Sequence, residues 1–76
     1  MTKTIWIVGG GVESIHGIKS AKRLGLNVVV SDGNPNAPGL KFADKSVIVS
    51  TYNIEETVSA AHEYNQNVSS IDGVIC

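Results

Sequence analysis

The sequence predicts an α/β protein, a small Rossmann-like open parallel sheet of about four strands with helices on both faces. The first observation is a series of short apolar runs rich in Val and Ile, which lack polar alternation and are typical of strands buried on both faces. The second is that helical patterns separate these runs, which implies right-handed crossovers between parallel strands. The third is a turn of consecutive glycines, Gly9–Gly11, directly after the first run.

Length and composition limit the chain to one small domain. It has 76 residues, of which 42% are hydrophobic and 17% charged, and its net charge is −1. Its basic residues are scattered among acids and form no stripe that would neutralise a phosphate backbone, so nucleic acid is not an expected partner. The apolar runs are too short for a signal peptide or a membrane span, which predicts a cytoplasmic location without membrane contact. The single cysteine, Cys76, excludes an internal disulfide and a zinc site built on paired cysteines.

The first strand is predicted over residues 4–8 and the first helix over residues 12–24, with Gly25 placed to end that helix. One arc of the helix is polar and the other is apolar or small, which predicts that the second arc packs on the sheet. That arc contains Ser14, Ile15, Gly17, Ile18, Ala21 and Leu24.

The second strand is predicted over residues 28–32, where three valines lead to Ser31 and Asp32. Residues 33–39 contain Gly, Asn and Pro in close succession and are expected to form a loop. Residues 40–43 have room for at most one helical turn, and a third strand follows over residues 46–50.

Asn53 is followed three residues later by Glu56, the pattern of a capping box that opens a second helix. This helix is expected to end in the polar segment 65–67, before a fourth strand that begins at Ile71 and includes Cys76. A further helix would normally cover such a bare apolar strand. We therefore expect residues 1–76 to be the N-terminal domain of a longer multidomain enzyme.

The expected strand order is 3-2-1-4, because the second helix would carry the chain back across the sheet to place strand four beside strand one. In this order the connections change direction between strands one and four. Ligands of open α/β sheets bind at the carboxyl ends of the strands at such a switch point, which is where the glycine turn lies.

The glycine turn nearly matches a dinucleotide-binding fingerprint. Glycines permit positive φ angles and close approach of a ligand, and the following helix start presents free amide groups. Asp32 stands at the end of strand two, where an acid would bind a ribose, although it also suits a turn-former. Ser14 replaces the third glycine of the fingerprint, and Glu13 places a carboxylate near the expected pyrophosphate position. The alternative is that the glycines only permit a sharp turn from strand to helix.

A set of motifs in order along the chain resembles the N-terminal domain of ATP-grasp enzymes. The set consists of a GGG turn after strand one, a D-x-N-P-x-A-P-G loop, an A-D pair before strand three and an S-T-Y-N helix opening. Its pattern is similar to those of the carbamoyl phosphate synthase large subunit, the biotin carboxylase type and the phosphoribosylaminoimidazole carboxylase ATPase subunit. The similarity covers nearly the whole chain.

The resemblance implies an ATP-dependent ligase that joins a carboxylate to an amine or another nucleophile, with ATP and Mg²⁺ held by domains that lie outside these residues. The domain itself would form one wall of the substrate cleft and would be inactive alone. Carried over, the substrate- or anion-binding residues are Gly9, Gly10, Gly11, Val12, Glu13, Ser14, Asp32 and Asn34. Glu13 departs from relatives that carry a neutral amide there, so an amine-bearing or neutral substrate would suit this chain better than a phosphate.

Two other functions stay open. One is an NAD(P)-binding Rossmann domain, which would normally have a third glycine and a full helix between strands two and three. The other is a regulatory or oligomerisation module that pairs with a second copy through the exposed edge of strand four. No catalytic residue or metal ligand is predicted, since His16 and His62 lack a second ligand at metal spacing and are expected on the surface.

Overall fold

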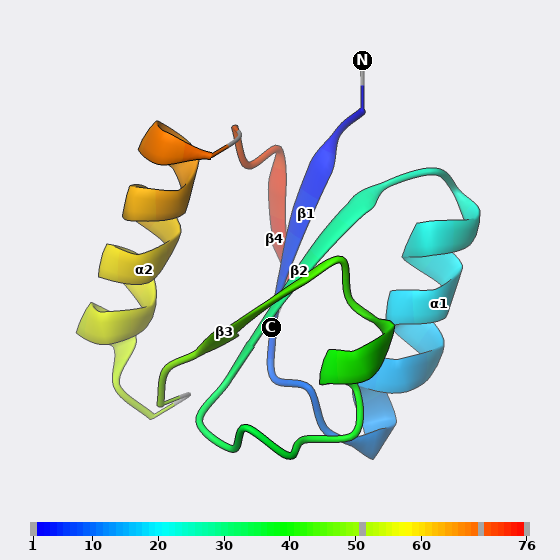
Figure 1. The fold of residues 1–76 in the computed structure, drawn as a ribbon, viewed down its shortest axis with the longest axis horizontal. Coiled ribbons are helices and arrows are strands. Elements are labelled where there is room, and N and C mark those ends of the chain that lie inside the picture. Colours follow the sequence, from blue (N-terminus) through cyan, green and yellow to red (C-terminus); the bar gives the residue numbers. More distant parts are fainter. Residues whose placement is uncertain (1, 51, 69, 76) are drawn as a thin grey trace.

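The computed structural model describes residues 2–50, 52–68 and 70–75, and in these residues it confirms the predicted fold. Its parallel strands form one sheet of four in the order β3-β2-β1-β4 (Figure 1). The strands are β1 (Thr4–Val8), β2 (Asn27–Asp32), β3 (Lys45–Ile48) and β4 (Gly73–Ile75). The α-helices are α1 (Ile15–Arg23) and α2 (Ile54–Asn67), and the short 3₁₀ helices are η1 (Val12–Ser14) and η2 (Leu40–Phe42).

The sheet separates two apolar clusters, because successive strand side chains point to opposite faces. α1 and η2 cover one face and α2 covers the other (Figure 1). Ile7, Ile18, Ala21, Val28 and Val30 are buried in the α1 cluster. The α2 cluster is smaller and is centred on Trp6, whose ring meets Tyr64 edge-on at a centroid distance of 5.7 Å.

The first helix ends as predicted but packs differently at its last turn. Gly25 has a φ of +82°, its amide donates to the Lys22 carbonyl, and the Leu26 amide donates to the Ala21 carbonyl, which together form a Schellman motif. The prediction that Leu24 packs on the sheet is wrong, since Leu24 is 80% exposed. The helix ends at Arg23, so Leu24 turns outward and Leu26 contacts the core instead.

Several boundaries differ from those predicted by small amounts. The predicted first helix starts as η1 before α1, the third strand runs from Lys45 to Ile48, and the fourth begins at Gly73 rather than Ile71. The Asn53 cap is confirmed, because its Oδ1 accepts a hydrogen bond from the Glu56 amide at 3.1 Å. The prediction that Cys76 lies in the fourth strand falls outside the described residues.

Carboxylates tie the loops to the β2 side of the sheet. Asp44, just before β3, accepts a hydrogen bond from the Val28 amide at 2.8 Å and pairs with the Lys22 ammonium. Its own amide donates to the Val28 carbonyl. The hydrogen bond from Lys22, followed by that from Val28, lowers the pKa of the Asp44 carboxyl. These bonds hold the loop after β2 against α1.

No helix in the described part of the chain is both long enough and apolar enough to cross a membrane.

Candidate functional site

The glycine turn lies at the carboxyl end of β1. The crossover connections change direction between β1 and β4, so the turn lies at the switch point of the sheet. Gly9 has a φ of +101°, a conformation that L side chains rarely adopt, and no atom lies within 4 Å of a Cβ built there. Its amide donates to the Ser31 carbonyl at 2.7 Å, which fixes the turn to the end of β2. The turn therefore requires glycine for its backbone angle.

Gly10 is held from two directions by the loop after β2. Its amide donates to the Asp32 carboxylate at 2.8 Å, and its carbonyl accepts from the Gly39 amide at 2.7 Å. A Cβ on Gly39 would lie 2.7 Å from that carbonyl oxygen, so the close approach needs glycine at this position. The glycine turn and the loop after β2 are therefore joined into one unit by hydrogen bonds.

Asp32 uses both carboxylate oxygens within this unit. Oδ2 accepts from the Gly10 amide and Oδ1 accepts from the Asn34 amide at 2.9 Å. The Asn34 side chain in turn accepts from the Asn36 amide at 2.9 Å. This geometry matches the turn-former alternative for Asp32, and the Asn34 side chain stabilises the same loop.

The remaining predicted residues form the start of the first helix. Val12 is 72% exposed, and Ser14 precedes α1 without making a side-chain capping bond. Glu13 folds back toward the turn, and its Oε1 would lie only 2.6 Å from a Cβ built on Gly11. The carboxylate therefore occupies the space over Gly11, where an anion would otherwise approach the backbone.

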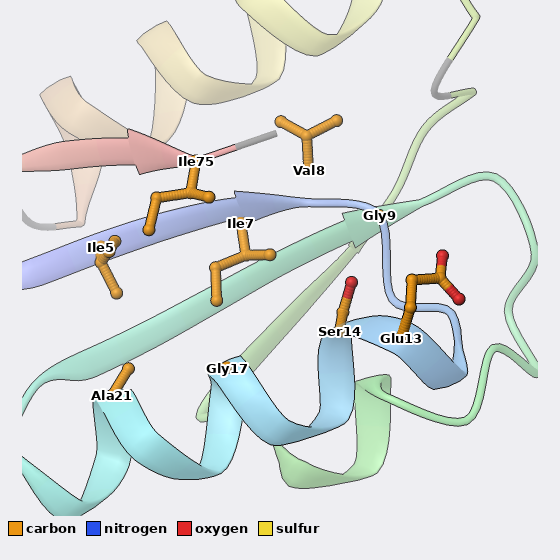
Figure 2. A pocket seen from close by; sticks show the side chains of 9 residues that line it. All are labelled: Ile5, Ile7, Val8, Gly9, Glu13, Ser14, Gly17, Ala21 and Ile75. Carbon is orange, nitrogen blue, oxygen red and sulfur yellow. The ribbon is translucent and has the colours of Figure 1, made fainter.

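A groove of about 480 Å³ runs from the glycine turn along the α1 face of the sheet. Figure 2 shows that Ile5, Ile7 and Ile75 point from β1 and β4 toward α1, while Ser14 points from the helix toward the strands. Gly17 and Ala21 form the helical wall. Its volume is in the range of small-molecule sites, which are also mostly apolar with few polar groups.

Sequence reasoning found the polar mouth of this groove but missed its apolar walls. The missed residues are Ile5, Ile7, Val8, Gly17, Ala21 and Ile75. Two signals were present: Ile5 and Ile7 are two apart on a strand, and Gly17 and Ala21 are four apart on a helix, so each pair shares a face. What the sequence lacked was the register that places Ile75 beside Ile7.

The described residues contain no group of three or more His, Cys, Asp or Glu side chains arranged to hold a metal ion. His16 and His62 are both exposed, as predicted, and His62 lies within hydrogen-bond distance of Gln66.

A comparison with curated proteins finds no match. Among solved structures, the chain is similar to N5-carboxyaminoimidazole ribonucleotide synthetase from Thermotoga maritima, with 29% sequence identity and a TM-score of 0.70. The match covers 78% of this chain but only 16% of that synthetase. This similarity supports the resemblance to the N-terminal domain of ATP-grasp enzymes.

The family comparison points to a second group of proteins. The family model described as alanine dehydrogenase/PNT, C-terminal domain, matches residues 2–76, which is almost the entire chain. The Rossmann-like sheet and its glycine turn agree with such a match. The chain therefore belongs to the alanine dehydrogenase/PNT C-terminal domain family.

Proposed function

We propose that residues 1–76 are the substrate-side N-terminal domain of an ATP-grasp ligase, either a carboxylate–amine ligase or an enzyme similar to carbamoyl phosphate synthase. The observation that carries this proposal is the 29% identity to N5-carboxyaminoimidazole ribonucleotide synthetase over 78% of the chain. The motifs named above lie within the same fold, including the loop from Asp32 to Gly39 that braces the glycine turn.

In this proposal the domain supplies one wall of a cleft and is inactive alone. The substrate approaches the turn of Gly9–Gly11 and the groove beyond it, while ATP and Mg²⁺ bind in further domains of the parent chain. Those domains are its main partners and cover the side of β4 that faces α2, where Val74 is 58% exposed. The enzyme acts in the cytoplasm.

The second candidate function is binding of NAD(P), which the dehydrogenase family favours. The turn from Gly9 to Ser14 supports this candidate only in part, because it lacks the third glycine of the fingerprint. The loop between β2 and β3 has η2 in place of a full helix, and the Asp32 carboxylate already accepts two backbone hydrogen bonds. These features favour the ligase domain.

A third candidate is self-association through β4, whose outer edge carries no charged side chain in the described segment from Gly73 to Ile75. Exposed edges recruit other strands. Sedimentation of the chain at increasing concentration tests this candidate, and a stable dimer would support it.

The main test is titration of the 76-residue chain with NADH, NADPH and ATP. Energy transfer from Trp6 reports the binding of either reduced nicotinamide, and Trp6 emission reports ATP. We expect weak or absent binding of all three nucleotides, because the ATP site belongs to other domains. Micromolar binding of NADH or NADPH would instead establish the second candidate. A second check is the downstream coding sequence, which should encode a glycine-rich lid and acidic metal ligands.

A further inference from the structure

The groove beside α1 has one charged group, and it lies at the mouth. Its floor and walls are apolar or small, and among the charged residues that the structure describes only Glu13 lines it. None of the Lys or Arg side chains contributes to its lining. A ligand that entered with a phosphate or carboxylate at the mouth would therefore meet a negative charge and no compensating cation.

Glu13 is also free to bind a ligand. In the described part of the chain, no hydrogen bond or ion pair engages its carboxylate. The side chain is exposed, and its carboxylate lies over Gly11, next to the glycine turn at the entrance of the groove. Ser14 adds a hydroxyl that points toward the strands on the same side (Figure 2).

We infer that this groove takes a small ligand with an ammonium group at one end and a short apolar body. The ammonium binds Glu13 and the Ser14 hydroxyl at the mouth, and the apolar body lies along Ile5, Ile7 and Ile75. Glu13 thus selects for amines and against anions, which replaces the phosphate recognition expected of a glycine turn. The inference rests on the proposed function in one respect, because it identifies the ligand as the amine substrate of the ligase.

The test uses amide chemical shifts of the ¹⁵N-labelled 76-residue chain. The probes are n-butylammonium, butyrate of matched length and inorganic phosphate, each at millimolar concentration. We expect n-butylammonium alone to shift the amides of Gly9, Ser14, Gly17 and Ile75. Butyrate and phosphate should leave them unchanged.

Two variants identify the charge responsible. Glu13→Gln should weaken n-butylammonium binding about 3- to 5-fold, which is the effect of one exposed ion pair. The matched control is Glu63→Gln, which removes the same charge from α2 outside the groove and should leave binding unchanged. Both positions are exposed, so both variants should fold.

Four results would overturn the inference. The first two are a shift of the groove amides by phosphate or butyrate, and the absence of any shift with n-butylammonium. The third is n-butylammonium binding that is unchanged in Glu13→Gln. The fourth is a shift of the Ile75 amide that depends on protein concentration without any added probe, which would indicate a second copy of the chain in the groove. Failure of the proposed function looks different, since micromolar NADH binding would contradict the ligase domain without deciding whether the groove selects amines.

Discussion

The two neighbours of β1 differ sharply, although they lie in the same sheet. Trp6 is paired with Val29 of β2 on one side and Val74 of β4 on the other, so the two valines occupy equivalent positions in one row. Val29 is 0% exposed and Val74 is 58% exposed. The next row repeats the pattern, with Val30 at 0% and Ile75 at 52%.

The difference arises from what covers each side. On the β2 side both faces are covered. α1, η2 and the loop to Gly39 close over the face that holds Val30, and α2 covers the face on which Val29 packs with Trp6 and Tyr64. Asp32 and Asp44 fix the loop segments by hydrogen bonds to backbone amides. On the β4 side, only part of each face is covered, and apolar residues remain exposed beside the groove. The β2 side is therefore the better-packed side of the sheet, and the β4 side leaves apolar side chains exposed.

The largest expected effect comes from tightening the closest contact on the β2 side. In Gly39→Ala the new Cβ would lie 2.7 Å from the Gly10 carbonyl oxygen and 3.0 Å from Ile18 Cδ1. We expect a loss of about 2–3 kcal/mol in the free energy of unfolding, measured by urea denaturation. The control is Gly17→Ala, where nothing lies within 4 Å and a gain of about 0.5–1 kcal/mol is expected. Equal effects of the two variants would contradict the packing difference.

The direct test of the comparison is to truncate Val29 and Val74, the two valines that flank Trp6 in the sheet. Val29→Ala should cost about 2 kcal/mol, because it removes buried methyl groups next to Trp6. Val74→Ala should change the free energy of unfolding by less than about 0.5 kcal/mol, since that side chain is largely in solvent. If both variants lost the same stability in urea, the β4 side would be as well packed as the β2 side.

A smaller effect is expected from the buried hydrogen bond between β1 and β2. The Trp6 indole N–H donates to the Ser31 hydroxyl at 3.0 Å, and both residues are 0% exposed. Ser31→Ala should cost about 1–2 kcal/mol, because the indole N–H loses its acceptor. In the Trp6→Phe background the same change should cost less, as both partners are then apolar. A double-mutant cycle followed by circular dichroism measures this coupling, and additive losses would argue against the bond.

The smallest expected effect concerns pH. The Lys22 hydrogen bond, with that of Val28, lowers the pKa of Asp44 in the folded state. Its stabilisation is therefore present above the unfolded carboxyl pKa of about 3.9 and is lost as pH falls through the lower folded value. Asp44→Asn should cost less than about 1 kcal/mol at neutral pH, because the pair is partly exposed. The difference between wild type and variant should shrink below pH ~4, and a difference that persisted at lower pH would contradict this role.

The local patterns of the sequence determined the elements and their order. Apolar runs predicted the strands, Asn53 with Glu56 predicted the start of α2, and Gly25 predicted the end of α1. These features depend on residues close together in the chain, whose preferences are set by backbone angles and side-chain period. The glycine turn was recognised for the same reason, since its unusual φ angle is a local property.

Only the tertiary structure decided which residues surround the site. Asp32 reaches Gly10 across 22 positions, Gly39 packs on Gly10, and Ile75 joins Ile7 in the groove wall. Such contacts depend on strand register and loop path, which the sequence pattern does not specify. Burial was decided in the same way, because Val29 and Val74 look alike in sequence and differ only in what the fold places over them.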